Sequence, residues 1–281
     1  MFGSRIWGLD LGRSAVKGVL LAPGGKNGVK ILDADIIPLE GTPPEGGTNP
    51  VRDPRLWQAL RIFNERHGLH RHGVALSVPA QNVLVRDLEV PSVGQKKMQE
   101  LVRFEASSEI PFVLDEVMWD YTLFPERPED PTRHGFLLAI KKNVIERYLE
   151  GLDQLGIERI ETITVAPLAL LHFVRMEFAE MGRAMALDVG ALSTSMLIVD
   201  ESRFWMRTIN AGGRRATEMM QEEFELDFEA AEKAKKNMTK SQYAGRIIKA
   251  IRPAMDELIR DIRTNLNYLE KSENLGAVDA A

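Results

Sequence analysis

One motif occurs twice in this chain, and this repeat limits the possible folds more than any other feature. Residues 9–17 read Leu-Asp-Leu-Gly-Arg-Ser-Ala-Val-Lys, and residues 187–195 read Leu-Asp-Val-Gly-Ala-Leu-Ser-Thr-Ser. In each copy an aspartate near the end of an apolar run is followed two residues later by glycine. A turn of small or hydroxyl-bearing residues then leads into a second apolar run. The pattern predicts a β-hairpin that opens each of two α/β lobes.

The residue types in the repeat suit the binding of phosphate. Glycine lets backbone N–H groups approach an anion, hydroxyl groups add donors, and a carboxylate can hold Mg²⁺ through water. An isolated copy is better interpreted as a plain hairpin whose aspartate caps the turn. Two copies instead point to two lobes that face one nucleotide, with one hairpin on each side of it.

The rest of the chain predicts alternating strands and helices. Apolar runs indicate strands at residues 5–12, 15–21, 29–37, 74–78, 83–85, 117–124, 136–140, 160–165 and, as a second hairpin, 185–199. Helical spacing indicates helices at residues 54–67, 95–108, 144–155, 167–181, 216–224, 228–236 and about 244–271.

The two hairpin motifs resemble the phosphate motifs of the actin-like ATPase superfamily, and a further segment narrows the resemblance. Phe104-Glu105-Ala106, followed at 110–117 by Ile-Pro-Phe-Val-Leu-Asp-Glu-Val, is similar to the FEA…IPFPLDEV stretch of the PilM family. This family comprises cytoplasmic type IV pilus assembly proteins related to FtsA. Gly212-Gly213 with Thr217, and the segment 228–235, resemble its GG…T and FEEAE…K signatures. The resemblance spans residues 5–270.

The resemblance implies an α/β, actin-like (ribonuclease H-like) fold of two lobes with an FtsA/PilM-type inserted subdomain. We expect residues 1–78 and 159–182 to form the first lobe, 79–158 the insert and 183–281 the second lobe. The second lobe should be incomplete at its C-terminal end, because the family's Gly-Gly adenosine motif is missing from the chain. Within the insert, Phe104, Ile110 and Phe112 are expected to be core residues.

ATP and Mg²⁺ are the cofactors that the resemblance implies, with Asp10 and Asp188 holding the metal through water. Lys17 would face the phosphates, although a solvent-exposed strand lysine is an equal interpretation. Glu232 and Lys235, three residues apart on one helix, would contact ribose or adenine, or else form a surface ion pair. The predicted cofactor-binding residues are Asp10, Gly12, Ser14, Lys17, Asp188, Gly190, Ser193, Thr194, Gly212, Gly213, Glu232 and Lys235.

Three positions refine this expectation. Gly212 and Gly213 either admit a phosphate or ribose near the N-terminus of the next helix, a common anion site, or simply make the turn before that helix. Ala166 stands where the family usually has a carboxylate or amide that orients the attacking water, and alanine cannot do so. No catalytic residue is therefore assigned, and the chain is at most a slow ATPase.

Composition restricts the partners. The net charge of −5 argues against nucleic acid or an anionic membrane surface as the main partner. The longest apolar run, residues 165–171, is too short to span a bilayer. The resemblance implies a cytoplasmic protein recruited to the inner membrane by the N-terminal tail of a PilN-like protein, which would lie in a groove between the first lobe and the insert. Other pilus platform proteins and self-association remain open.

Two alternative functions would place the chain in other classes of protein. An actin-fold sugar kinase would share the phosphate hairpins, but no carboxylate base is anchored to a recognisable motif, and residues 110–112 speak against it. A nucleotide-free pseudo-ATPase module, comparable to the type II secretion protein GspL, would explain the missing adenosine motif. The intact Asp10, Gly12, Asp188 and Gly190 favour nucleotide binding instead.

Overall fold

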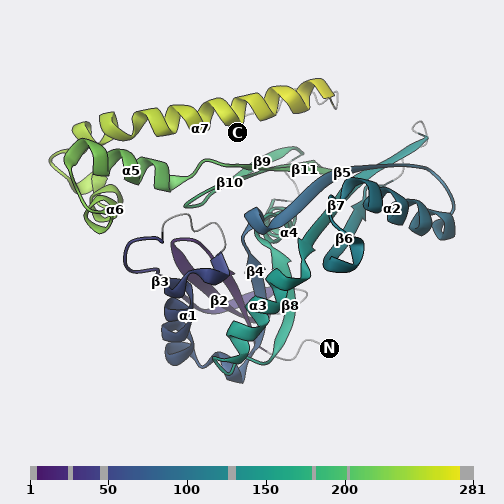
Figure 1. Ribbon diagram of the computed structural model, residues 1–281, viewed down its shortest axis with the longest axis horizontal. Helices are drawn as coiled ribbons and strands as arrows, with labels where there is room; N and C mark the ends of the chain where they lie inside the picture. Colours follow the sequence, from purple (N-terminus) through teal and green to yellow (C-terminus); the bar gives the residue numbers. More distant parts are fainter. Residues whose placement is uncertain are drawn as a thin grey trace.

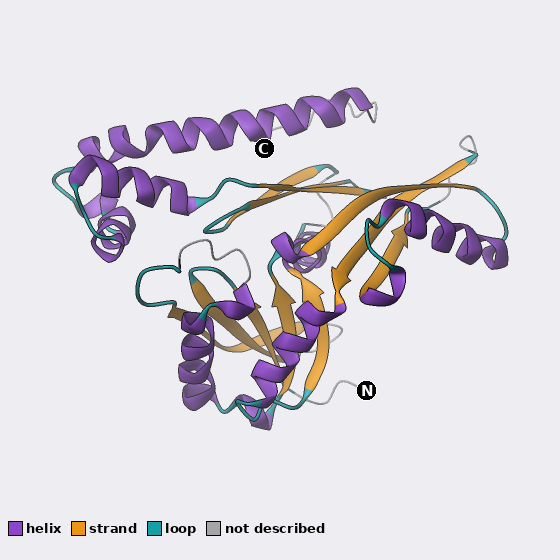
Figure 2. Cartoon of the chain, in the orientation of Figure 1, coloured by secondary structure: helices purple, strands orange, loops and turns teal. Residues whose placement is uncertain are grey.

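The computed structural model describes residues 5–24, 28–44, 50–125, 131–178, 182–200 and 203–272. Within these ranges the chain forms three separate β-sheets with helices packed against them (Figure 1; Figure 2). The predicted α/β class is therefore confirmed. Short 3₁₀ helices occur at Pro50–Arg52, Leu69–Arg71, Ala80–Asn82, Leu114–Glu116 and Met238–Lys240.

The first sheet has five strands in the order β3-β2-β1-β4-β8. Strands β1 and β2 form the first predicted hairpin, β3 extends it antiparallel, and β4 and β8 add parallel to β1 on its other side. The strands are β1 (Ile6–Leu11), β2 (Ala15–Pro23), β3 (Val29–Pro38), β4 (Gly73–Val78) and β8 (Ile160–Val165).

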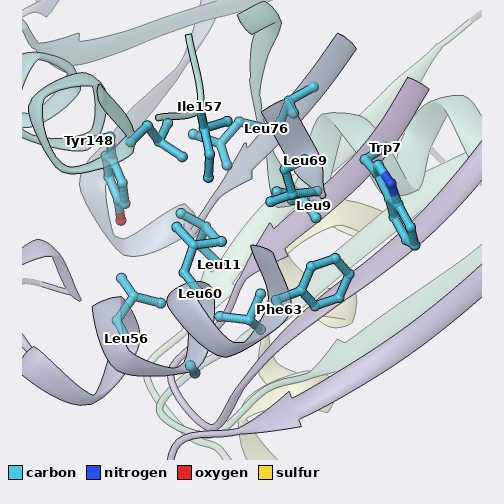
Figure 3. Close-up of a cluster of buried hydrophobic side chains, with 14 of the residues drawn as sticks. Trp7, Leu9, Leu11, Leu56, Leu60, Phe63, Leu69, Leu76, Tyr148 and Ile157 are labelled. Atoms are coloured by element: carbon cyan, nitrogen blue, oxygen red, sulfur yellow. The ribbon is translucent and has the colours of Figure 1, made fainter. Parts of the chain in front are cut away.

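Helices α1 (Pro54–His67) and α3 (Lys142–Asp153) bury one face of this sheet. Alternate residues of β1, namely Trp7, Leu9 and Leu11, point into that core together with Phe63 of α1 (Figure 3). Such alternation is what a strand covered on one face by helices should show. Gly18 is required below the helix, since a Cβ there would lie 2.3 Å from the ring of Phe63.

The second sheet lies in the predicted insert and has the order β5-β7-β6, with every neighbour antiparallel. Helix α2 covers one face of this sheet, and the opposite face packs toward the second lobe through Phe136 and Leu138. The elements are β5 (Val83–Pro91), α2 (Gln95–Glu109), β6 (Val117–Leu123) and β7 (Thr132–Lys141).

Two aromatic rings of the insert do not occupy the positions expected for them. Ile110 is buried as predicted, but Phe104 is 68% exposed and Phe112 is also exposed. For Phe104 the reason is the phase of α2, which buries Met98, Val102 and Ala106 on one side and leaves Phe104 on the other. Phe112 lies beyond the end of α2, where Lys141 Nζ is 4.1 Å from the centroid of its ring. The expectation that these two phenylalanines are core residues was therefore wrong.

The end of the insert stays a proposal, which the packing of α3 helps to refine. Residues 79–158 were assigned to the insert, and α3 falls inside that range. Its buried side chains Leu152 and Tyr148, the latter labelled in Figure 3, nevertheless share the core of the first sheet. We propose that the insert ends near Lys141 and that the chain returns to the first lobe with α3.

The third sheet repeats the opening hairpin as β9 and β10, and β11 extends it in the order β11-β10-β9. Helix α4 packs on β10, α7 contacts β11, and α5, α6 and α7 pack together (Figure 1). The elements are α4 (Ala166–Glu177), β9 (Ala184–Val189), β10 (Thr194–Val199), β11 (Phe204–Ile209), α5 (Gly213–Phe224), α6 (Phe228–Lys236) and α7 (Ala244–Ser272). Strand β11 was not predicted, and the last predicted residues of α4, 179–181, lie outside the described residues.

Aromatic packing and an ion pair join the insert to the second lobe. Phe124 and Phe136 of the insert contact Phe204 of β11, with ring centroids 5.3 and 5.0 Å away respectively. Arg207 of β11 pairs with Asp87 of β5, with Nη2 and Oδ2 2.9 Å apart. Among the described helices, we find none with the length and apolarity to cross a membrane.

Candidate functional site

The turns of the two hairpins open onto one cleft of about 890 Å³ between the lobes. The first lobe contributes residues of the β1–β2 turn and of the segment after β3. The second lobe contributes the β9–β10 turn, the start of α5 and one face of α6. Six of the predicted residues line this cleft: Ser14, Lys17, Gly190, Gly213, Glu232 and Lys235. The duplicated motif thus faces a common cavity from both sides.

The two hairpin turns have the same local geometry. Gly12 N–H donates to Ala15 O at 3.1 Å, and Gly190 N–H donates to Ser193 O at 2.9 Å. A Cβ on Gly12 would lie 2.9 Å from Ala15 O, and a Cβ on Gly190 would lie 2.9 Å from Ser193 O. Neither position therefore has room for a side chain. The glycines at this place in the repeat are therefore explained by close backbone packing within each turn.

The two aspartates differ in their surroundings. Asp10 lies opposite Lys17 in the β1–β2 register, and Lys17 Nζ is 3.0 Å from Asp10 Oδ2. Asp188 lies at the equivalent place on β9, where its cross-strand neighbour is Ser195 and its side chain is exposed. A cation held by Asp10 would have to share that carboxylate with Lys17.

The other six predicted residues do not line the cleft. They are Asp10, Gly12, Asp188, Ser193, Thr194 and Gly212. Thr194 is fully buried, and its hydroxyl donates to Ala211 O at 2.8 Å, so that hydroxyl is engaged within the protein. It ties β10 to the segment that leads into α5.

The start of α5 is seated directly on the second hairpin. A Cβ on Gly212 would lie 2.6 Å from Gly190 O and 2.7 Å from Ala191 O. The N–H groups of Gly213 and Arg214 donate to these two carbonyls at 2.9 and 2.8 Å. The first amides of α5 are thus used inside the protein, which weakens the expectation that this helix N-terminus binds an anion.

Glu232 and Lys235 meet Thr217 in a closed polar cluster that joins α5 to α6. Lys235 Nζ donates to Thr217 Oγ1 at 2.6 Å, to Gly213 O at 2.9 Å and to Glu232 Oε1. Glu232 Oε1 also accepts a hydrogen bond from Thr217. Burial raises the pKa of Glu232, but the hydrogen bonds from Lys235 and Thr217 outweigh it and hold that pKa below the ordinary value. Glu232 and Lys235 are half-buried, so they are more than a surface ion pair.

Sequence reasoning missed two arginines of the cleft. Arg13 follows Gly12 in the first turn and is only 7% exposed, while Arg214 is the second residue of α5. The described lining residues include six basic side chains (Arg13, Lys17, Arg214, Lys233, Lys235 and Lys236) and three acidic ones (Glu40, Glu229 and Glu232). The excess of three positive charges, in a chain whose net charge is −5, suits a polyanionic ligand.

A second concavity, of about 450 Å³, separates the insert from the first lobe. It runs between β6, an edge strand of the insert sheet, and β8, an edge strand of the five-stranded sheet. Residues 118–122 of β6 form one wall, residues 162–165 of β8 the other, and Leu138 and Ile140 of β7 contribute further lining. Edge strands present unpaired backbone N–H and C=O groups, so this groove can accept an extended chain.

The groove is largely apolar with a few hydroxyl groups. Thr122, Thr162 and Thr164 line it, and Asp120 is the one charged residue among the described lining residues. Met118 is 53% exposed at its rim. This chemistry suits apolar side chains at alternate positions of a bound strand.

A family model and a solved complex both match this chain over most of its length. The family model for the type IV pilus assembly protein PilM matches residues 8–281. A solved PilM-PilN type IV pilus biogenesis complex contains a chain that is 28% identical, with a TM-score of 0.78 over 95% of this chain and 78% of that chain. The ethanolamine utilization protein EutJ from Carboxydothermus hydrogenoformans is 13% identical, with a TM-score of 0.49 over 95% of this chain and 71% of that one. The cytoplasmic domain of EpsL, from the type II secretion system of Vibrio cholerae, is 11% identical, with a TM-score of 0.46 over 73% and 71%.

The family match covers nearly the whole chain, and it does not favour the kinase or secretion-module alternatives. The fold is that of the actin-like ATPases, as the resemblance of the two hairpin motifs implies. This chain belongs to the PilM family of type IV pilus assembly proteins.

Proposed function

We propose that this chain is a cytoplasmic pilus assembly protein that captures the N-terminal tail of a PilN-like inner-membrane protein in the groove between β6 and β8. The observation that carries this proposal is the pair of edge strands on either side of one apolar groove. A bound tail would add main-chain hydrogen bonds to an edge and place alternate side chains in the groove. The solved complex with PilN, to which the chain is similar, supports the choice of partner.

The proposal also includes ATP with Mg²⁺ in the interlobe cleft. The excess positive charge of the cleft lining fits a polyphosphate, and Phe228 of α6 adds an aromatic ring to that lining. Asp10 and Asp188 would hold Mg²⁺ through water, which neutralises phosphate charge. The described residues contain no cluster of three or more potential ligands, so direct coordination by the protein alone is not part of the proposal.

Hydrolysis in this cleft would be slow. Ala166 is the first residue of α4, directly after β8, and its methyl group can neither accept a proton nor orient a water molecule. We therefore propose that the nucleotide serves to hold the lobes in one arrangement rather than to drive rapid turnover.

A matched pair of methionines tests the peptide groove. Met118 lies at the groove and is 53% exposed, and Met176 lies on α4 outside the groove lining and is 58% exposed. Binding of a synthetic PilN-like N-terminal peptide would be measured by calorimetry on Met118→Arg and Met176→Arg. We expect Met118→Arg to weaken binding by about tenfold or more, ~1.4 kcal/mol, and Met176→Arg to leave it unchanged. Equal affinity in both variants would place the peptide elsewhere.

A further inference from the structure

One carboxylate lies in the otherwise uncharged groove between the insert and the first lobe. Asp120 is at the middle of β6, and it is the one charged side chain among the described residues that line this groove. Its Oδ1 accepts a hydrogen bond from the backbone N–H of Tyr121 at 2.8 Å, and no ion pair joins it to another residue of the described ranges. The groove therefore presents a single negative charge to a chain that enters it.

The alternation along β6 turns this carboxylate toward the groove. Trp119 and Tyr121 pack against the cores that the insert sheet forms with α2, so Asp120, which stands between them, lies on the opposite face. In the register with β7, the neighbour of Asp120 is Leu138, which is buried and also lines the groove. A cation beside Asp120 would therefore lie against an apolar wall.

The basic residues that flank the groove in sequence do not neutralise Asp120. Lys141 belongs to the face of the insert sheet that α2 covers, and its ammonium lies over an aromatic ring, 4.1 Å from the centroid. Lys142 is exposed in the first turn of α3 and makes no ion pair with Asp120. Arg159 pairs with Glu161, with Nε and Oε1 2.7 Å apart, and neither of these two residues lines the groove. The charge of Asp120 is thus left for a ligand.

We propose that Asp120 binds a lysine or arginine side chain of the partner's N-terminal tail and thereby selects which part of the tail lies beside β6. This inference rests on the peptide groove proposed above and names a residue that determines specificity there. Short cytoplasmic segments next to a membrane span are rich in Lys and Arg, so a tail of that kind carries the matching charge. In a strand added to β6, the residue directly opposite Asp120 would have its Cβ about 5 Å away, within reach of an ion pair.

The neighbours of Asp120 on the groove face define the residues on either side of that cation. An added strand would place the residues two positions before and after the cation opposite Met118 and Thr122. Met118 is apolar and 53% exposed, whereas Thr122 offers a hydroxyl group. We therefore expect the tail to present an apolar, a basic and a small or polar side chain at alternate positions.

Calorimetry on the whole chain with a synthetic PilN-like N-terminal peptide would test the proposal. Each Arg of the peptide would be replaced by citrulline and each Lys by norleucine, one at a time, so that the charge is lost and the shape is kept. We expect Asp120→Asn to weaken binding of the unmodified peptide about fivefold, ~1 kcal/mol, and to leave binding of one neutralised peptide unchanged. Asp115→Asn is the control and should have no effect, because Asp115 is exposed in the same insert but does not line the groove.

The outcomes separate this inference from the groove itself. If Asp120→Asn binds the peptide as the natural chain does while Met118→Arg binds it more weakly, the groove stands and the role of Asp120 is wrong. If neither substitution changes the affinity, the groove is wrong and this inference falls with it. An equal effect of Asp120→Asn on every neutralised peptide would show that no side chain pairs with Asp120. If only acetylation of the peptide's N-terminus abolishes the effect, the bound cation is the α-amino group, and the assignment to a side chain is overturned.

Discussion

Gly212→Ala should lower the stability of the protein, because the added methyl group would clash with the backbone of the second hairpin. The backbone of Gly212 is extended, with φ of −160°, so alanine has no conformational penalty and the effect is purely steric. The new Cβ would lie 2.6 and 2.7 Å from two backbone oxygens of the second hairpin, which cannot rotate away as a side chain can. The start of α5 must therefore move away from β9 and β10.

The size of the effect follows from what that movement breaks. Overpacking of this kind costs roughly 1–3 kcal/mol. The hydrogen bonds from Gly213 and Arg214 to the hairpin, at 2.9 and 2.8 Å, would lengthen, and each contributes about 0.5–1.5 kcal/mol. Allowing for partial relaxation, we expect a loss of about 2–4 kcal/mol. For a domain of this size that corresponds to a fall in Tm of roughly 5–10 °C.

Thermal unfolding of Gly212→Ala, followed by circular dichroism, would be compared with Gly245→Ala. Gly245 lies in α7 with open space around its Cβ position, so alanine there should be neutral or up to about 1 kcal/mol stabilising. Nucleotide affinity should also fall in Gly212→Ala, since Gly190 and Gly213 line the cleft. A Tm of Gly212→Ala within 1 °C of the natural chain would refute the tight seating of α5 on the hairpin.

Three further predictions concern the cleft. Asp10→Ala and Asp188→Ala should each lower Mg-ATP affinity in calorimetry by about tenfold, ~1.4 kcal/mol, and unchanged affinity in both would end their assignment to Mg²⁺. Ala166→Glu or Ala166→Gln should raise phosphate release several-fold, whereas brisk release by the natural chain would show that another group orients water. The pKa of Glu232 is held below its ordinary value of 4.5, so its contribution to stability is present above that pH and is lost as pH falls through the folded-state pKa. Glu232→Gln should therefore lower Tm at pH 7 and approach the natural chain at low pH, and an equal deficit at every pH would contradict this.

The repeat and the apolar periodicity predicted most of the fold because they report local geometry. The alternation of Trp7, Leu9 and Leu11 predicts a strand with one buried face, and the glycine of each turn predicts a hairpin. Strand β11 escaped detection because Phe204, Trp205 and Met206 are all buried, so no polar alternation marks it. Tertiary contacts, which no local pattern encodes, decided that α3 packs with the first lobe.

The sequence predicted only part of the candidate site, again because tertiary packing is not encoded in a local pattern. Motif spacing identified the two turns and the helix that face the cleft, but the orientation of individual groups depends on packing between lobes. Thr194 follows Ser193 in the motif, yet its hydroxyl is used by Ala211. Arg13 lies inside the quoted motif but has no counterpart in the second copy, where Ala191 stands at the equivalent position. The phosphate contacts predicted for this turn were the Ser14 hydroxyl and the Lys17 charge, so Arg13 was passed over.

The most direct test of the proposed function is hydrogen–deuterium exchange of the whole chain with and without the PilN-like peptide. We predict that the peptide slows exchange of backbone amides in β6 (Val117–Leu123) and β8 (Ile160–Val165), because one or both edges gain a hydrogen-bonded neighbour. The open edges of β3 and β9 serve as internal controls and should exchange at the same rate in both samples. Protection at β3 or β9, with β6 and β8 unchanged, would contradict the proposed groove.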